Sequence, residues 1–490
     1  MPLTDALTKH LKVKDLIPAA ALLDGQWVER SDSGKTFEVR NPATGELLAT
    51  LPDMGVSETK RAIAAAEAAQ GAWAKKTGKA RAAVLRKMFD LMMTHQDDLA
   101  AIMTAEQGKP LSEAKGEIAY GASYVEWFGE EAKRVYGDVI PGHQEDKRII
   151  VIKQPVGVVA TITPWNFPNS MLARKMAPAL AAGCAVVSKP AAETPLSAIA
   201  LARMAEMAGL PKGLFNLILG TDAPAIGQEF CSNEIVRKLS FTGSTQVGRV
   251  LMRQAADQIK RLGLELGGNA PFIVFDDADL DAAVEGALIS KYRNNGQTCV
   301  CANRLYVQAG VYDAFAEKLV AATKKLKVGD GFGEGTTLGP LINKKAIEKV
   351  ERHIADATGK GAKVLLGGKA KDGLFFEPTV LADATQQMTI AREETFGPVA
   401  PLFRFETVEE VIAMANDTEF GLASYFYARD LSRVFKVAEA LDYGMVGINT
   451  GLISTELAPF GGVKQSGHGR EGSKYGIEEY LDIKYLSLAV

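Results

Sequence analysis

The chain has 490 residues, of which 47% are hydrophobic and 23% are charged. At roughly 150 residues per domain, this length predicts about three structural units, and the composition is that of a globular protein rather than of a disordered or membrane-embedded chain. The formal net charge is only −3 and the isoelectric point is about 6.1, so we expect no nucleic-acid partner.

The first residues of the chain carry charges at Asp5, Lys9, Lys12, Lys14 and Asp15. These charges interrupt the apolar core that a signal peptide requires. No later stretch reaches the about 18 unbroken apolar residues of a membrane-spanning helix. We therefore expect a cytoplasmic protein without a membrane partner.

The expected elements begin with two stretches rich in Ala, Leu, Glu and Lys, which predict long helices over 56–71 and 81–120. From about Gly157, short β-branched runs alternate with longer amphipathic stretches. This rhythm predicts a parallel sheet covered by helices. The segments of this series are 158–163, 169–182, 185–188, 195–208, 215–219, 238–241, 246–258 and 263–266.

A second α/β series runs from 272–275 to 445–448 and predicts a second sheet. It includes 280–293, 305–307, 314–325, 408–415 and 424–428. Residues 147–153 and 480–488 alternate like strands, but no partner for them is identifiable from the sequence.

The cysteines are too few for a disulfide framework. There are four, at Cys184, Cys231, Cys299 and Cys301. The five histidines are scattered without the spacing of metal ligands, so we expect no metal site.

Cys299 lies in the segment NNGQTCVC (294–301), between an expected helix and an expected strand. A thiol on such a glycine-bearing loop is a candidate nucleophile, and thiolates add readily to aldehydes. The alternative is that Cys299 and Cys301 are two small buried hydrophobic residues. This segment by itself favours the alternative slightly.

Two further segments carry candidate catalytic groups. Glu265, in LELGGNAP (264–271), ends an apolar strand; burial there would raise its pKa, as a general base requires, although an ion-paired or solvated Glu is common at such a position. Asn166, in TPWNFP (163–168), follows a strand and precedes a helix. Its amide can donate to an oxyanion or simply cap the helix.

Phosphate-binding patterns are ambiguous in this chain. Gly467–Gly472 matches GxGxxG by letter, but no strand precedes it and no βαβ unit follows, so we interpret it as a false match. Gly243–Gly248 has the spacing of a Walker motif without its Lys and Ser or Thr, yet it opens a helix whose N-terminus suits a pyrophosphate. Lys189 lies at the carboxyl end of a strand, where ligands of α/β sheets bind.

Taken together, these segments resemble the aldehyde dehydrogenase family over nearly the whole chain. TPWNFP, FTGSTQVG, LELGGNAP, GQTCVCANR, EETFGPV and PFGGVKQSG occur in the family's order. The resemblance implies that Cys299 is the nucleophile, that Glu265 is the general base, and that Asn166 and the Cys299 backbone N–H form an oxyanion hole. It also implies a cofactor site at Trp165, Lys189, Ala192, Gly243, Ser244, Gly248, Leu266, Glu394 and Phe396.

The fold implied by this resemblance is α/β: a Rossmann-type cofactor domain, an α/β catalytic domain and a β oligomerisation arm. We expect the dinucleotide-binding domain over 1–130 and 149–264, the catalytic domain over 265–460, and the arms over 131–148 and 470–490. The protein would then be a homo-oligomer, a dimer or a tetramer.

Within the family, the segments 291–304, 451–467 and 469–481 look like the branch that oxidises succinate semialdehyde. In that branch two arginines and a serine bind the substrate carboxylate, and the matching positions are Arg174, Arg293 and Ser454. The alternatives are that Arg293 only complements a helix C-terminus and that Arg174 pairs with a surface acid. Cys301 is typical of the branch and is a candidate redox partner of the nucleophile or a packing thiol.

The cofactor is expected to be NADP, with NAD as the other possibility. Relatives that prefer NAD commonly have Glu three residues after the Lys that corresponds to Lys189, whereas this chain has Ala192. Three alternatives stay open: another semialdehyde such as glutarate semialdehyde, acyl transfer to coenzyme A, which Glu265 argues against, and a non-catalytic binding protein, which the intact catalytic set argues against.

Overall fold

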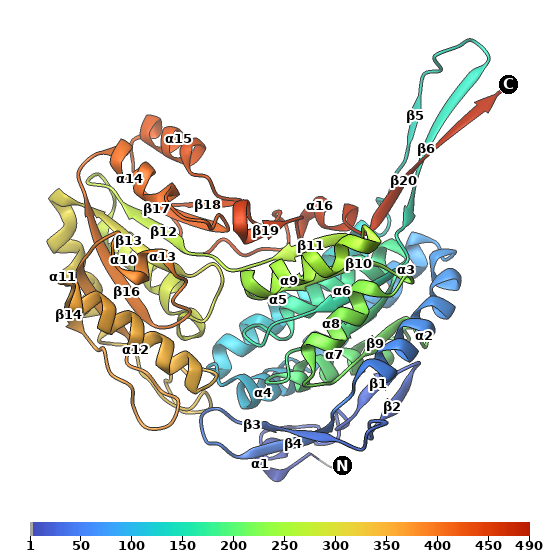
Figure 1. Ribbon diagram of the computed structural model, residues 1–490, viewed down its shortest axis with the longest axis horizontal. Helices are drawn as coiled ribbons and strands as arrows, with labels where there is room; N and C mark the ends of the chain where they lie inside the picture. The colour runs from blue at the N-terminus through green and yellow to red at the C-terminus, as the bar shows by residue number, and fades with distance from the viewer. Residues whose placement is uncertain (1–2) are drawn as a thin grey trace.

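The structure, a computed structural model, describes residues 3–490 and consists of two α/β halves with a thin β arm that projects from one of them (Figure 1). An eight-stranded sheet forms the first half. Its central strands are parallel and almost wholly buried, as expected for a sheet with helices on both faces. In spatial order they are β19 (Gly467–His468), β11 (Arg261–Glu265), β10 (Val236–Thr242), β7 (Val158–Ile162), β8 (Ala185–Lys189), β9 (Phe215–Leu217), β1 (Ala21–Leu23) and β2 (Gln26–Val28).

The second half contains a seven-stranded sheet, parallel except for one edge strand. Its order is β14 (Lys363–Leu366), β15 (Thr379–Ala384), β16 (Val399–Phe405), β13 (Ala302–Gln308), β12 (Ala270–Val274), β17 (Ala423–Tyr427) and β18 (Met445–Ile448). The expectation of two main sheets is therefore confirmed. A separate hairpin of β3 (Thr36–Arg40) and β4 (Leu47–Pro52) lies near the N-terminus.

The arm is built from the two alternating segments whose partners were unknown. β6 (Lys147–Pro155) pairs antiparallel with β20 (Leu481–Ala489) over nine residues and, on its other edge, with β5 (Asp138–Ile140). β6 and β20 lie more than 300 residues apart in the chain. Together with β5 they extend away from the body of the protein (Figure 1).

The helices cover both faces of the two sheets (Figure 1). Those of the first half are α1 (Asp5–Thr8), α2 (Val56–Ala74), α3 (Gly78–Thr94), α4 (Gln96–Gln107), α5 (Leu111–Glu131), α6 (Ser170–Ala182), α7 (Pro195–Met207), α8 (Ala223–Ser232), α9 (Thr245–Ala255) and α16 (Ser473–Glu478). Those of the second half are α10 (Leu280–Tyr292), α11 (Tyr312–Thr323), α12 (Lys344–Gly359), α13 (Thr389–Arg392), α14 (Val408–Asn416) and α15 (Leu431–Ala440). Short 3-10 turns are η1 (Ala256–Gln258), η2 (Arg293–Gly296), η3 (Ala309–Val311) and η4 (Lys464–Ser466).

The prediction of one helix over 81–120 was wrong, because the chain forms three helices there. It turns at His95, and α4 ends at Gly108, which adopts a left-handed φ of 89°. Pro110 then precedes α5 with extended backbone, as proline at a helix start favours. This break places Lys109 between α4 and α5, inside the protein. Among residues 3–490, no helix is long and apolar enough to cross a membrane.

Candidate active site

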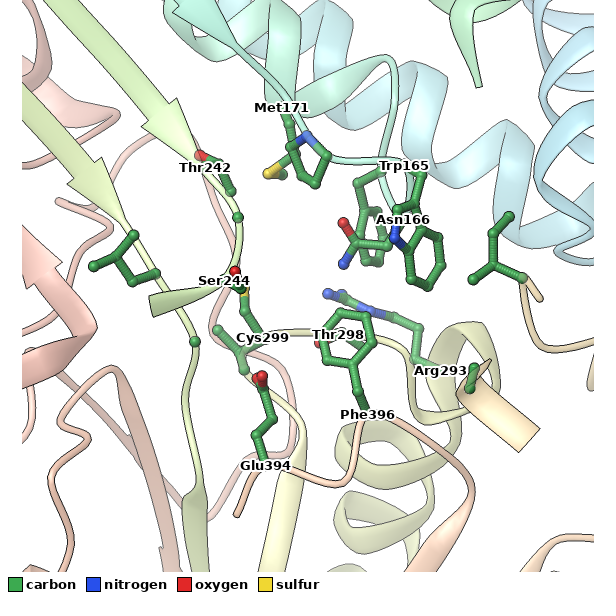
Figure 2. Close-up of a pocket in the computed structure, with 18 of the residues that line it drawn as sticks. Trp165, Asn166, Met171, Thr242, Ser244, Arg293, Thr298, Cys299, Glu394 and Phe396 are labelled. Atoms are coloured by element: carbon green, nitrogen blue, oxygen red, sulfur yellow. The ribbon is translucent and has the colours of Figure 1, made fainter. Parts of the chain in front are cut away.

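A cavity of about 350 Å³ lies between the two halves (Figure 2). The first half contributes loops that follow β7 and β10, and the second half contributes the loop before β13 and the loop after α13. Of the residues predicted from the sequence, eleven line this cavity: Trp165, Asn166, Arg174, Gly243, Ser244, Leu266, Arg293, Cys299, Glu394, Phe396 and Ser454. The fold therefore assembles most of the predicted site from segments that are far apart in the chain.

The loop that carries Cys299 begins with a left-handed turn. Asn294, Asn295 and Gly296 have φ values of 50°, 55° and 74°, a conformation that is unfavourable for most residues but tolerated by Asn and Gly. A Cβ atom at Gly296 would lie 2.2 Å from the backbone oxygen of Gly397. Only glycine fits at this point, where the nucleophile loop meets the loop after α13.

The Gln297 side chain fixes the same loop to the segment before α12. Its Nε2 donates to the Pro340 carbonyl at 3.3 Å, and its Oε1 accepts from the Ile342 N–H at 3.0 Å. The Gln297 backbone carbonyl accepts from Asn166 Nδ2 at 2.9 Å. The amide of Asn166 is thus in direct contact with the loop that carries the candidate nucleophile.

Cys299 is partly exposed, whereas Cys301 is fully buried. Burial raises the pKa of the Cys299 thiol to about 12, and the charge of Arg174 partly opposes that shift. The Cys301 Sγ donates to the Lys291 carbonyl at 3.1 Å and does not line the cavity. Of the two thiols, only Cys299 faces the space where a ligand can bind.

Glu265 ends β11 but lies beside the cavity rather than in its lining. Its side chain faces a small neighbouring cavity of about 10 Å³ that Ser240, Glu471 and Tyr480 also line. Its Oε2 has no hydrogen-bond partner, and burial together with repulsion from Glu471 holds the pKa of Glu265 well above its usual range. Both effects favour the protonated form of this carboxyl.

Arg174 and Arg293 both reach the cavity, in different electrostatic settings. The Nε of Arg174 forms a buried ion pair with Glu471, and its guanidinium lies 4.2 Å from the centre of the Phe460 ring. Its Nη1 and Nη2 are buried without a hydrogen-bond partner. Arg293 stacks 5.1 Å from the Phe167 ring centre, and within residues 3–490 it forms no ion pair. An anion in the cavity would satisfy both guanidinium groups.

Four of the predicted cofactor residues come from three loops around the cavity: Trp165 after β7, Ser244 before α9, and Glu394 and Phe396 after α13. Ser244 caps α9 by accepting from the Val247 N–H, and Glu394 Oε1 accepts from the Gly268 N–H at 3.1 Å. Burial raises the pKa of Glu394 to about 7. The rings of Trp165 and Phe396 pack edge to face, with their centres 5.6 Å apart (Figure 2).

Other predicted residues lie outside this cavity. Ala192 lines a second cavity of about 650 Å³, and Ile342 lines both cavities, so the two adjoin. Lys189 is buried at the end of β8, where its Nζ donates to the Pro190 carbonyl at 3.0 Å. Gly248 lies in α9, and a Cβ there would approach Leu266 to 2.6 Å, so this glycine permits close packing of α9 on that residue.

Sequence reasoning missed several residues of the site. Glu471 pairs with both Arg174 and Lys175 in the interior, although it belongs to the segment interpreted as a false phosphate motif. Lys109 and Glu117 form another buried ion pair beneath Asn166. Glu471 lies in an isolated β-bridge with Phe460, and Lys109 lies in the break between α4 and α5, so local periodicity gave no signal for either. Within the described chain, no cluster of three or more His, Cys, Asp or Glu side chains is arranged to hold a metal ion.

The fold and the cavity define an α/β protein in which two halves enclose an accessible thiol. Its sequence matches the aldehyde dehydrogenase family over residues 27–486. It is 66% identical to a glutarate-semialdehyde dehydrogenase of Pseudomonas putida, with 98% of this chain and 100% of the relative aligned. It is 63% identical to an NADP-dependent succinate-semialdehyde dehydrogenase of Escherichia coli, with the same coverage.

Solved structures agree with this assignment. The fold superimposes with a TM-score of 0.97 on the crystal structure of a succinate-semialdehyde dehydrogenase from Burkholderia pseudomallei, which is 63% identical over 98% of this chain and 100% of that chain. The chain therefore belongs to the aldehyde dehydrogenase family, which confirms the resemblance and the fold predicted from the sequence.

Proposed function

We propose that the protein oxidises succinate semialdehyde to succinate with NADP, with NAD as the alternative cofactor. The observation that carries the substrate assignment is the pair of guanidinium groups, Arg174 and Arg293, in the cavity that also exposes Cys299. An acid semialdehyde places a carboxylate at one end and a reactive carbonyl at the other. The names of the relatives support this substrate class.

In the proposed reaction, the Cys299 sulfur adds to the aldehyde carbon after loss of its proton. Asn166 Nδ2, now bound to the Gln297 carbonyl, and the Cys299 backbone N–H then donate to the oxygen that becomes negative. A nicotinamide dinucleotide, when bound, supplies the acceptor for the hydride that leaves this carbon. A thioester on Cys299 results.

Glu265 completes the reaction in this proposal. It takes a proton from water as the hydroxide adds to the thioester carbonyl. The carbon–sulfur bond then breaks, the carboxylic acid is released, and the Cys299 thiolate takes back the proton from Glu265. Because Glu265 lies in the small neighbouring cavity, its side chain must turn toward Cys299 for this step. It must also lose the proton that burial favours.

Several observations suit a bound dinucleotide. The two cavities adjoin at Ile342. The N-terminus of α9 at Ser244 supplies unpaired N–H groups and a positive dipole end for phosphates. Glu394 and Phe396 lie beside Cys299, where they would hold the nicotinamide end (Figure 2). In this proposal Lys189 and Ala192 face the adenosine end.

The substrate assignment is tested by comparing a charged with an uncharged aldehyde. Arg174→Ala and Arg293→Ala should each lower kcat/KM for succinate semialdehyde by about tenfold or more, since a charge-assisted hydrogen bond contributes roughly 1.5 to 3 kcal/mol. Turnover of butanal, which lacks the carboxylate, should change much less, and Ser454→Ala should have a weaker effect in the same direction. An equal fall of kcat/KM with both aldehydes would mean that the arginines have a structural role and do not bind the substrate carboxylate.

Glutarate semialdehyde is the second candidate substrate, because a relative of that name is 66% identical. It is longer by one methylene, which a hydrophobic pocket distinguishes by about 1–3 kcal/mol. Steady-state kinetics of the purified protein with both semialdehydes decide between them. Parallel assays with coenzyme A test acyl transfer, which we expect to be absent because Glu265 provides the base for hydrolysis.

Cofactor preference is expected to depend on Ala192. Without a carboxylate at this position, a 2′-phosphate meets no repulsion from residue 192, and Lys189 can pair with it once its Nζ turns from the Pro190 carbonyl. NADP should therefore give the higher kcat/KM, and Ala192→Glu should shift the preference toward NAD. Glu193 lines the same cavity, so Glu193→Ala is the companion variant. A higher kcat/KM with NAD in the unmodified protein would refute this interpretation.

A further inference from the structure

Lys109 and Glu117 form an ion pair that is wholly enclosed by protein. Their side chains are 0% and 1% exposed, and Lys109 Nζ lies 2.5 Å from Glu117 Oε2. Removing two charges from water costs several kcal/mol per ion, which the attraction between them rarely exceeds. An ion pair of this kind is therefore poor evidence for stability, and its other contacts indicate what it does.

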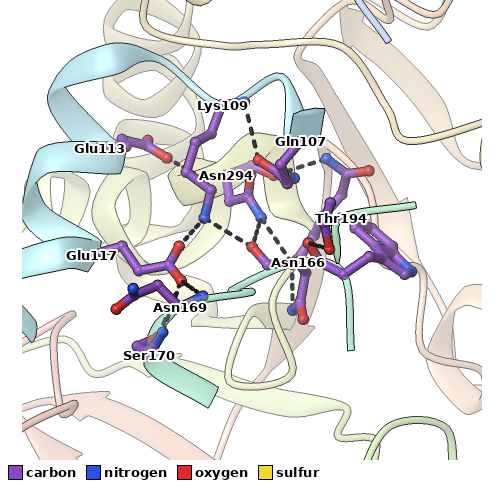
Figure 3. Close-up of polar contacts among 11 residues, drawn as sticks. Gln107, Lys109, Glu113, Glu117, Asn166, Asn169, Ser170, Thr194 and Asn294 are labelled. Carbon is purple, nitrogen blue, oxygen red and sulfur yellow. Dashed lines mark hydrogen bonds and ion pairs between the residues drawn. The ribbon is translucent and has the colours of Figure 1, made fainter. Parts of the chain in front are cut away.

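The Lys109 ammonium also holds the backbone of Asn166. Its Nζ donates to the Asn166 carbonyl at 2.8 Å (Figure 3). It also lies 3.9 Å from the centre of the Phe167 ring. Asn294 Nδ2 donates to the same carbonyl at 3.0 Å. Two donors thus converge on the backbone of the residue whose side chain is the candidate oxyanion donor.

The Glu117 carboxylate fixes the other end of the same loop. Its Oε1 accepts from the backbone N–H groups of Asn169 and Ser170 at 3.0 and 3.1 Å. Asn169 precedes α6 but makes no side-chain capping bond of its own. A carboxylate on α5 therefore caps α6, and the loop from β7 to α6 is held at its middle by Lys109 and at its end by Glu117.

The same helix holds the nucleophile loop one turn away. Glu113 Oε2 accepts from the Asn294 N–H at 2.8 Å. Glu113 and Glu117 are four residues apart on α5, so they project from one face as neighbours. One turn of α5 therefore separates Glu113, which holds the loop of Cys299, from Glu117, which holds the loop of Asn166.

We propose that Lys109 and Glu117 are positioning residues that align Asn166 with the reacting carbonyl. The inference rests on the proposed function, because it assigns Asn166 to the oxyanion. Neither Lys109 nor Glu117 lines the cavity. They act through the loop that they hold, and a shift of about 1 Å in an aligned group is enough to lower a rate by about a hundredfold.

The test measures two reactions of the same thiol in Lys109→Met. Aldehyde oxidation passes through an oxyanion, whereas alkylation of Cys299 by iodoacetamide occurs at a saturated carbon and does not. We expect kcat with aldehyde to fall by about 10- to 100-fold and the alkylation rate to stay within about twofold. An equal loss in both reactions would mean that the variant merely disorders the loop and would overturn the proposal.

Arg81→Met is the matched control for loss of a buried cation. Arg81 is 7% exposed and its Nε donates to the Ala181 carbonyl at 2.8 Å, at the opposite end of α6 from Glu117. We expect this variant to lower Tm but to leave kcat within about twofold of the unmodified protein. A loss of kcat as large as in Lys109→Met would show that destabilisation alone explains the effect, against the proposal.

A double-variant cycle separates this inference from the proposed function. If Lys109 acts through Asn166, Lys109→Met should lower kcat with aldehyde by less than about threefold when Asn166→Ala is already present. The full loss in both backgrounds would overturn the positioning role. An unchanged rate in Asn166→Ala would overturn the oxyanion assignment itself, and this inference with it. An unchanged rate in Lys109→Met alone overturns only this inference.

Glu117→Gln keeps the proposal testable if Lys109→Met does not fold. The amide retains one oxygen for the N–H groups of α6 but no longer neutralises Lys109. We expect kcat with aldehyde to fall, by less than in Lys109→Met, while the alkylation rate of Cys299 stays normal. Full aldehyde turnover in Glu117→Gln would overturn the proposal.

Discussion

Burial acts in the same direction on the two side chains that the proposed reaction uses. It raises the pKa of the Cys299 thiol to about 12 and keeps the pKa of the Glu265 carboxyl well above its usual range. With a pKa of about 12, the Cys299 thiol holds its proton at neutral pH, and the shift of Glu265 favours its protonated form. A thiol in this state is protected from adventitious alkylation and oxidation, because the thiolate is the reactive form.

The raised pKa of Cys299 predicts a steep pH dependence of its reactivity. Below the pKa, the thiolate fraction grows about tenfold per pH unit. The rate of inactivation by iodoacetamide in cofactor-free protein should therefore keep rising from pH 7 to pH 9. A plateau reached below pH 8 would contradict the assigned environment. Cys231→Ala is the control, because that buried thiol should not contribute to the rate.

The separate roles of Cys299 and Glu265 predict different failures. Cys299→Ala should abolish turnover, whereas Glu265→Gln should still form the thioester and release a burst of reduced cofactor, since only hydrolysis needs the base. Stopped-flow absorbance of the nicotinamide measures both. A steady rate in Cys299→Ala close to that of the unmodified protein would refute the mechanism.

Cys301 is a candidate redox partner of Cys299, although it is buried and bonded to the Lys291 carbonyl. A disulfide across two residues is strained and readily reduced, and here it would also require the Cys301 side chain to turn. Peroxide should inactivate the protein and dithiothreitol should restore it. Cys301→Ala should remove this reversible part. Unchanged reversible inactivation in that variant would leave Cys301 as a packing thiol.

At the scale of elements, the turn over 294–296 decides where the nucleophile lies. Three consecutive left-handed residues store backbone strain of order 1–3 kcal/mol per non-glycine residue, and hydrogen bonds from Asn294 and Gln297 hold that turn in place. The strand β13 that follows provides a rigid support for the loop.

Gly296→Ala should damage this element severely. Its Cβ would approach the Gly397 oxygen to 2.2 Å at a φ of 74°, so the loop must shift. We expect a Tm lower by several degrees, since strain of this kind costs more than about 1 kcal/mol, and a large loss of turnover. Gly310→Ala is the control, because a Cβ there meets nothing within 4 Å. Equal behaviour of the two variants would show that the turn does not position Cys299.

At the scale of the whole molecule, the arm exposes several large apolar side chains. Val139, Ile483, Tyr485 and Leu488 are 82%, 70%, 58% and 52% exposed, and they lie on a three-stranded sheet that projects from the body (Figure 1). Exposed apolar strands are interaction surfaces or aggregation hazards. We propose that they are buried in a homo-oligomer.

Charges on the arm should weaken that assembly. Ile483→Lys combined with Leu488→Lys should lower the molar mass measured by light scattering from that of a dimer or tetramer, because buried lysines require ion partners. Val364→Lys on the edge strand β14, where Val364 is 44% exposed, should leave the mass unchanged. An unchanged mass in the double arm variant would place the interface elsewhere.

Local sequence patterns were enough to predict the strand and helix rhythm of both sheets and the chemical groups of the site. These properties are local. Side-chain periodicity marks β7, β8 and α6 within a few residues of their observed limits, and Cys299, Asn166 and Arg293 stand in motifs that are recognisable by letter. Side-chain periodicity did not predict the short strands within residues 21–52 or the helix breaks at 95 and 108–110. The periodic pattern of the strands is weak, and each break depends on one or two residues.

Contacts between groups that are distant in the chain could not be predicted in this way. The pairing of β6 with β20, the ion pair of Arg174 with Glu471, and the contact of Lys109 with Asn166 join segments separated by 57 residues or more. Nothing in local periodicity encodes such contacts, because they depend on how the two sheets and α5 pack together. The same packing buries Glu265 beside the cavity. Burial raises the pKa of this carboxyl, and the sequence motif identified the residue without indicating how deeply it is buried.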